Sequence, residues 1–346
     1  MKQRKVPVEE ALGMILPHDM TKIVPNQFKG PAFRKGHVVR AEDIPELQKM
    51  GKAHLFALEL EPGEIHEDDA GLRIAQAAAG RNVHTSVPKE SRVNLISASR
   101  GLLQVNVAAL LALNELDDVV FSCLSNRTPV EAGELLAGTK VIPLVVPEET
   151  VRDAESICAG LGKIVEVIPY QGLKAGIVVT GGEVYHQQIA DAFGPVLREK
   201  LESYGASVLP LVYAPDDAEV IAQKIDDLAG QGAELILVSG GMSVDPDDVT
   251  PQGIRRSGAQ IEKYGAPVLP GAMFLLAYKG DIPIIGMPAC GMFFRITVLD
   301  LILPRLFTGE RLGRADMVAL AHGGLCRNCP QCRYPRCSFG QGGIQR

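Results

Sequence analysis

The alternation of predicted strands and helices in residues 171–310 constrains the fold more than any other feature of the chain. Short aliphatic runs predict buried strands, and the longer amphipathic segments between them predict helices. The predicted strands span residues 175–180, 208–213, 234–239 and 260–264, the predicted helices span residues 187–204, 218–230 and 292–307, a further helix starts at Pro251, and a hairpin covers residues 274–285. This spacing predicts an open α/β domain with a largely parallel sheet.

Three of the predicted strand ends carry a glycine turn. These turns are Thr180-Gly181-Gly182-Glu183, Ser239-Gly240-Gly241 and Gly286-Met287-Pro288-Ala289. In an open α/β sheet, ligands bind beyond the carboxyl ends of the strands. We therefore expect the three turns to line one crevice.

The second turn continues into an acidic loop. Ser243 adds a hydroxyl, and Asp245, Asp247 and Asp248 add carboxylates before Thr250-Pro251. The Thr-Pro pair predicts a helix that starts there, with Thr at the N-cap. Amides at this point can hold an anion, and a divalent cation can bridge the anion to the carboxylates. The alternative is a surface loop with a solvated acidic run.

The motifs in these turns resemble the molybdenum-cofactor biosynthesis domain, a family of molybdopterin adenylyltransferases and molybdopterin molybdotransferases. The resemblance rests on TGGEV at residues 180–184, SGGMSVDPDDVTP at residues 239–251 and GMPA at residues 286–289. It implies that residues 171–310 form a three-layer α/β/α domain that binds molybdopterin.

The resemblance also implies roles for single residues. Asp248 matches an acid that the family uses around the substrate phosphate and Mg²⁺, and we assign it and Asp245 as catalytic. Asp245 stands where molybdotransferases often have glycine, and Ala289-Cys290 replaces the usual Gly-Asn or Gly-Ser. The predicted cofactor-binding residues are Thr180, Gly181, Gly182, Glu183, Ser239, Gly240, Gly241, Ser243, Thr250 and Pro288.

The residues before 171 are only partly similar to a molybdotransferase. Residues 8–20 and 32–58 are similar to two of its segments, but the large lobe expected between them is missing. We divide the chain into a small α+β module (1–62), an α+β segment (63–170), the molybdopterin-binding domain (171–310) and a Cys-rich tail (311–346). His66 and the three acids after it favour a helix start over a metal cluster.

The tail contains four closely spaced cysteines, Cys326, Cys329, Cys332 and Cys337, in the pattern C-x2-C-x2-C-x4-C. Such spacing is typical of a metal centre, and zinc and an iron–sulfur cluster both stay open. Because the thiols are local in sequence, we expect the site to close without the α/β domain, whose core should not need it. From Arg311 onward there are six arginines and one acid, which indicates either a solvated tail or a surface for an acidic partner or a phosphate.

Composition bounds the class of protein. The chain has 346 residues, 46% of them hydrophobic, and a net charge of −6, which argues against nucleic acid as a partner. No apolar run reaches the roughly 18–20 residues of a membrane helix, and no apolar core follows the basic N-terminus, so we expect a cytoplasmic protein without a membrane partner. The expected partners are molybdopterin, a molybdenum enzyme and further copies of the chain.

Three functions follow from these observations. The first is Mg²⁺-dependent insertion of molybdate into adenylylated molybdopterin by a molybdotransferase-like enzyme. The second is a carrier that holds the finished cofactor without catalysis, which the missing lobe and the added tail favour. The third is a nucleotide pyrophosphate hydrolase, because residues 240–250 also resemble the competence-damage family.

Overall fold

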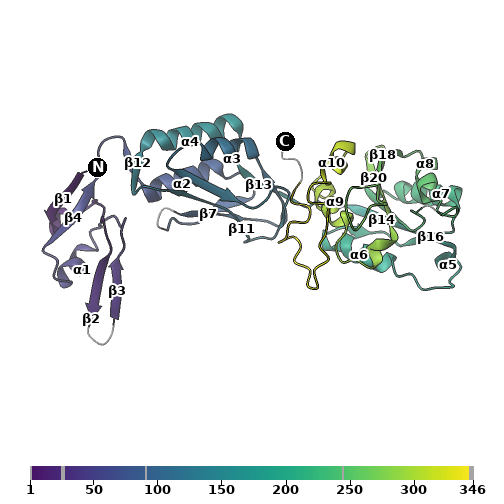
Figure 1. Cartoon of the computed structure of the whole chain (residues 1–346), viewed down its shortest axis with the longest axis horizontal. Helices are drawn as coiled ribbons and strands as arrows, with labels where there is room; N and C mark the ends of the chain where they lie inside the picture. Colours follow the sequence, from purple (N-terminus) through teal and green to yellow (C-terminus); the bar gives the residue numbers. More distant parts are fainter. Residues whose placement is uncertain (1, 25–27, 90–91, 244, 343–346) are drawn as a thin grey trace. The chain divides into compact units, whose positions relative to one another are not determined.

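The computed structural model describes residues 2–24, 28–89, 92–243 and 245–342, and the chain divides into two compact units (Figure 1). Unit 1 comprises Met1–Ala98, Val105–Leu124 and Ala132–Glu166, and unit 2 comprises Ser99–Gln104, Ser125–Glu131 and Val167–Arg346. Two short segments from the middle of the chain therefore belong to the same unit as the C-terminal half. The four-part division drawn from the sequence stays a prediction.

Unit 1 begins with a small module of two antiparallel strand pairs. Its elements are β1 (Lys2–Pro7), η1 (Val8–Glu10), β2 (Met20–Val24), β3 (Phe28–Phe33), α1 (Ile44–Lys49) and β4 (His54–Glu59). Strand β1 pairs with β4, and β2 pairs with β3. Val6, Leu16, Leu47 and Leu55 are buried together and form part of the module's core.

The rest of unit 1 contains a four-stranded antiparallel sheet. The sheet order is β6 (Val83–Thr85), β7 (Val93–Ser97), β11 (Leu135–Val141), β9 (Val119–Cys123), with the pair β5 (Glu64–His66) and β12 (Val145–Pro147) and the helices α2 (Glu67–Ala78), α3 (Val107–Asn114) and α4 (Glu148–Leu161). His66 is buried at the N-cap of α2, where its Nδ1 accepts from the Asp68 amide at 3.2 Å and its Nε2 lies 2.7 Å from the Gly36 carbonyl oxygen. The preference for a helix start at His66 is confirmed.

Unit 2 is built on a largely parallel sheet. The order is β15 (Ser207–Val208), β14 (Lys174–Thr180), β17 (Leu235–Ser239), β20 (Ile282–Met287), β19 (Leu275–Lys279), β18 (Gln260–Tyr264), and β16 (Val212–Ala214) also pairs with β14. Strands β14, β15, β16, β17 and β20 run parallel to one another. Strand β19 pairs antiparallel with β20 on one side and with β18, at the sheet edge, on the other. The mixed α/β fold and the hairpin predicted from the sequence are confirmed.

Both faces of this sheet are covered, because neighbouring residues of each strand point to opposite sides. Ile177, Leu237 and Ile285 pack with α6 (Gly194–Ser203) and α9 (Val298–Leu306). Val178, Ile236 and Ile284 pack on the other face with α7 (Ala218–Gly230) and α8 (Thr250–Arg256). The sheet therefore lies between two pairs of helices, which can be followed by their labels in Figure 1.

Three predicted elements are shorter in the structure. The helix expected at residues 187–204 is α6 alone, with Pro195 in its first turn, and a short helix α5 (Gly182–Tyr185) precedes it. The strand expected at residues 208–213 is split into β15 and β16 around Pro210, which cannot donate a ladder hydrogen bond. The helix expected at residues 292–307 is η2 (Ala289–Met292) followed by α9, which begins at a capping box between Thr297 and Asp300.

The tail packs onto the core of unit 2. Leu312, Met317 and Leu320 from the region of α10 (Arg314–Ala319), together with Phe339, join the hydrophobic cluster of α6 and α9. The hydroxyl of Tyr334 donates to the Asp300 carbonyl oxygen at 2.9 Å. The structure therefore differs from the expectation of an independent tail, because apolar residues before and after the cysteines complete the domain core.

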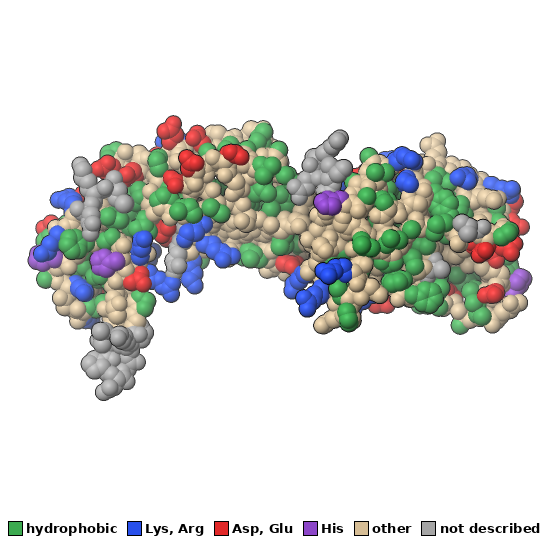
Figure 2. Space-filling model, viewed as in Figure 1, with side chains coloured by type: hydrophobic (Ala, Val, Ile, Leu, Met, Phe, Trp, Pro, Cys, Tyr) green, Lys and Arg blue, Asp and Glu red, His purple; other side chains and the backbone are tan. Residues whose placement is uncertain are grey.

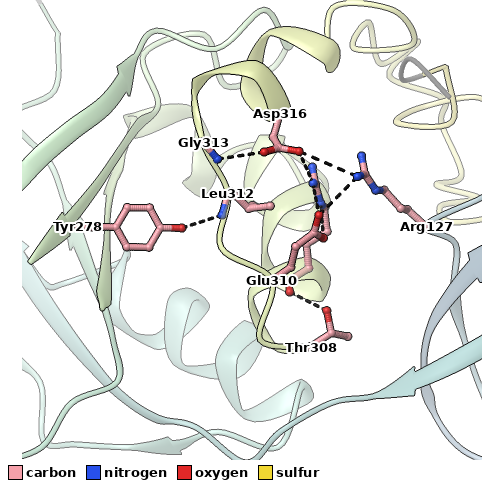
Figure 3. A network of polar contacts seen from close by, with 8 residues as sticks. Arg127, Tyr278, Thr308, Glu310, Leu312, Gly313 and Asp316 are labelled. Carbon is pink, nitrogen blue, oxygen red and sulfur yellow. Dashed lines mark hydrogen bonds and ion pairs between the residues drawn. The ribbon is translucent and has the colours of Figure 1, made fainter. Parts of the chain in front are cut away.

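An ion-pair network joins the segment Ser125–Glu131 to the end of α9 and the start of α10 (Figure 3). The almost fully buried Arg305 guanidinium contacts Glu310 and Asp316, and Arg127 lies 3.4 Å from Glu310. Burial alone would raise the pKa of Asp316, but hydrogen bonds from the Gly313 amide and Arg305 outweigh it and hold this pKa below its ordinary value.

The remaining sheet of the chain has the order β10 (Pro129–Val130), β8 (Gly101–Val105), β13 (Val165–Pro169). Its pairs Pro129–Leu102 and Val130–Gly101 lie within unit 2. Among the described residues, no helix combines the length and the apolar character that crossing a membrane requires.

Candidate functional site

A pocket of about 610 Å³ opens at the carboxyl ends of β17 and β20, and we call it the glycine-loop pocket. Five predicted site residues line it, namely Gly240, Gly241, Ser243, Asp248 and Pro288, and Met242 of the same stretch lines it as well. Cys290, which follows the third motif, lines it as well. The structure therefore brings two of the three predicted turns together around one cavity.

The glycine loop, Gly240–Gly241, can adopt its conformation only because neither residue has a side chain. Gly240 and Gly241 have φ values of +89° and +54°, the left-handed region that favours glycine. A Cβ on Gly240 would lie 2.5 Å from the Thr180 carbonyl oxygen, and a Cβ on Gly241 would lie 2.7 Å from Thr250 Oγ1. The loop backbone consequently packs directly against Thr180 and Thr250 and turns toward the pocket.

The hydroxyls of these two threonines contact each other and the backbone next to the loop. The hydroxyl of Thr180 donates to the Ser239 carbonyl oxygen at 2.8 Å and lies 3.1 Å from Thr250 Oγ1. Thr180, Ser239 and Thr250 are buried and do not line the pocket. The resemblance implies that all three bind the ligand; the structure places them outside the pocket lining, and their role in binding stays a prediction.

The start of α8 also differs from the sequence prediction. Val249, not Thr250, is the N-cap residue, and the Thr250 amide donates to the Gly241 carbonyl oxygen at 3.2 Å. This amide is therefore already bonded within the loop.

The first glycine turn lies outside the pocket lining. Gly181 has a φ of +133°, and the Gly182 amide donates to Asp216 Oδ2 at 2.7 Å. Glu183 is exposed on α5. Asp216 is not among the residues predicted from the sequence. Its position just after β16 was the signal that could have placed it near the first glycine turn.

Of the three acids in the loop, only Asp248 reaches the pocket. Its carboxylate accepts from the Asp245 amide at 3.2 Å, while the side chains of Asp245 and Asp247 are exposed. Asp248 is therefore the one carboxylate of the acidic loop that a ligand in this pocket would meet. Burial, and then the Asp248 charge, raise the pKa of the neighbouring Tyr264, whose hydroxyl donates to the Met242 carbonyl oxygen.

The opposite wall of the pocket was not predicted. It consists of Leu269–Met273, Phe294, Leu325, Cys326 and Asn328. The Leu269 amide donates to the Gly324 carbonyl oxygen and the Cys326 amide donates back to Leu269, both at 2.8 Å, so the tail is paired to this wall. The Pro270-Gly271 turn was a readable signal for a loop, but nothing in the sequence linked it to the tail.

The four tail cysteines do not form a metal centre in the structure. Within the described ranges, no three His, Cys, Asp or Glu side chains come close enough together to hold a metal ion. The four thiols instead line a neighbouring pocket. The arrangement does not fit zinc or an iron–sulfur cluster.

Comparison with known proteins agrees with the fold and the glycine turns. Residues 176–308 match the family described as "Probable molybdopterin binding domain". Residues 176–308 belong to the molybdopterin-binding family of molybdenum cofactor biosynthesis. Residues 5–59 match a domain of unknown function.

Two curated relatives match part of the chain. A molybdopterin molybdenumtransferase of Synechococcus elongatus is 26% identical over 178 residues, which cover 47% of this chain and 44% of that protein. A CinA-like protein of Mycolicibacterium vanbaalenii is 37% identical over 83 residues, covering 24% of this chain and 20% of that protein. The chain thus spans less than half of the length of these relatives.

Two solved structures are also similar. The molybdopterin biosynthesis enzyme MoaB of Thermus thermophilus is 21% identical, covers 40% of this chain and 98% of its own, and has a TM-score of 0.33. The protein CinA of Thermoplasma acidophilum is 16% identical, covers 35% of this chain and 90% of its own, and has a TM-score of 0.31.

Proposed function

We propose that unit 2 binds molybdopterin in the glycine-loop pocket and inserts molybdate into the adenylylated form of this pterin with the help of Mg²⁺. The observation that carries the proposal is the single pocket in which Gly240, Gly241, Asp248 and Pro288 meet. The molybdopterin-binding family of residues 176–308 and the similarity to a molybdopterin molybdenumtransferase support it.

The residues of the pocket suit this chemistry. The loop at Gly240–Gly241 lets a ligand approach the backbone closely, and the Ser243 hydroxyl can donate to a phosphate oxygen. Asp248 and Asp245 would hold Mg²⁺, which neutralises negative charge on the phosphate when it is bound. No nucleophilic side chain is required, because transfer at a phosphoryl centre depends mainly on positioning and electrostatics.

The test is turnover of adenylylated molybdopterin by the purified full chain, with and without molybdate and Mg²⁺. AMP release that requires both ions supports the proposal. Glu219→Gln, which alters an exposed ion pair between Glu219 on α7 and Arg256 on α8, is the control and should keep wild-type turnover. Tight pterin binding without turnover would instead identify a carrier, and absence of binding would refute the pterin site itself.

The CinA-like relatives favour a second candidate, hydrolysis of a nucleotide pyrophosphate. The same loop and Mg²⁺ would then hold a pyrophosphate in place of the pterin phosphate. Release of nucleoside monophosphate from ADP-ribose, without any effect of molybdate, would support this candidate over molybdate insertion.

A cytoplasmic location, a homo-oligomer and a molybdenum enzyme as recipient also belong to the proposal. Light scattering on the purified chain measures the oligomer. Reconstitution of a cofactor-free molybdenum enzyme, with the loaded chain as the only source of cofactor, tests delivery to a recipient.

A further inference from the structure

A second pocket, of about 400 Å³, lies between the segment Phe293–Ile296 and the tail loop, and we call it the tail pocket. Phe294, Leu325, Cys326 and Asn328 line both this pocket and the glycine-loop pocket. A ligand in the tail pocket would therefore be a direct neighbour of a ligand at the glycine loop.

The tail pocket is fixed to the body of unit 2. The pairing between Leu269 and the Gly324–Cys326 segment holds one end of the tail loop, and the half-buried Tyr334 holds the other through the Asp300 carbonyl oxygen. Phe339, only 4% exposed, closes the base within the core cluster. The pocket walls are thus tied to the packed structure at both ends of the loop.

The charged side chains that line this pocket are all positive. Arg295, Arg327 and Arg333 line it, and no aspartate or glutamate does. In the described part of the chain none of these three guanidinium groups forms a hydrogen bond or an ion pair, whereas Arg305 and Arg256 in the same unit contact carboxylates. Figure 2 shows blue side chains gathered over the tail loop, which is the yellow loop of Figure 1.

We propose that the tail pocket binds a tetrahedral oxyanion through Arg295, Arg327 and Arg333, beside the ligand of the glycine-loop pocket. Guanidinium groups pair with oxyanions through two parallel N–H···O bonds, so unpartnered arginines around one cavity favour such an ion. We assign this oxyanion the role of a second substrate, and this role rests on the proposed function. The same chemistry would also accept the phosphate end of a larger ligand.

The experiment titrates the full chain separately with molybdate alone and with inorganic phosphate alone, by calorimetry at low ionic strength. The variant R327Q/R333Q should bind the preferred anion at least tenfold more weakly than the wild type. Arg314→Gln removes an equally exposed tail arginine outside the pocket and should change affinity less than twofold. Tighter molybdate binding assigns the site to a free oxyanion, and equal or tighter phosphate binding assigns it to a phosphate group.

Two results would overturn the proposal. One is wild-type protein that binds neither anion at millimolar concentration, and the other is an R327Q/R333Q variant with wild-type affinity. Gly241→Val, which disrupts the glycine loop, separates this outcome from failure of the proposed function. The Gly241→Val variant should lose pterin binding and keep anion binding. A wild-type protein that binds the anion but no pterin would refute the pterin site and leave the anion site standing.

Discussion

Replacing Phe339 by alanine tests whether the tail is part of the domain core. The Phe339 side chain is 4% exposed, and its ring contacts the Tyr334 ring edge-on at 6.3 Å between centroids. Removing a buried phenylalanine costs about 3–5 kcal/mol, because the transfer free energy of the ring is lost and a cavity is left. In a unit of this size, each 1 kcal/mol lowers the melting temperature by about 2–4 °C, so we expect a fall of roughly 6–20 °C.

The assay is thermal unfolding followed by circular dichroism and calorimetry, because the chain has no tryptophan for fluorescence. Val318→Ala is the matched control, since Val318 is 49% exposed on α10 of the same tail and should change the free energy of unfolding by less than about 0.5 kcal/mol. A Phe339→Ala protein that melts at the wild-type temperature would refute the packing argument and restore the independent tail expected from the sequence.

The remaining predictions concern the glycine loop, its acid and the ion-pair network. Gly241→Val should abolish pterin binding in calorimetry, because its Cβ would lie 2.7 Å from Thr250 Oγ1; wild-type affinity would place the pterin elsewhere. Asp248→Asn should lower turnover by about 10²–10³ with an unchanged dichroism spectrum, and unaltered Mg²⁺ dependence would remove Asp248 from the site. The pKa of Asp316 is lowered in the folded state, so its contribution to stability exists above the ordinary pKa of about 3.9 and is lost as pH falls through the lower folded value. The stability difference between the wild type and Asp316→Asn should therefore shrink below about pH 4, and a difference that grows there would contradict the network.

The sequence predicted the sheet of unit 2 well because its information is local. Aliphatic runs such as that of β17 are buried on both faces, and a continuous apolar run of this length is typical of an internal parallel strand. The glycine loop was predictable for the same reason, since adjacent glycines after a strand favour positive φ. Prolines set several of the boundaries that differ, as at β15, β16 and α6.

The site was predicted less completely because half of its wall comes from distant segments. The pairing of Leu269 with Leu325 joins residues more than fifty positions apart, and no period or motif encodes it. The cysteine spacing favoured a metal centre, but spacing alone does not report where the thiols point. Thr180 and Thr250 matched binding motifs, and the sequence alone did not indicate that both are buried against the backbone of Gly240 and Gly241.

The interleaving of the two units has a consequence for how the protein can be divided. Unit 2 draws Ser99–Gln104 and Ser125–Glu131 from between stretches of unit 1, so no single cut of the chain releases it whole. A fragment that starts at residue 171 would lack Arg127 and leave Glu310 and Asp316 with Arg305 alone. During synthesis, Arg127 is made well before Glu310 and Asp316, so we expect this part of the ion-pair network to form only after the last third of the chain has been made.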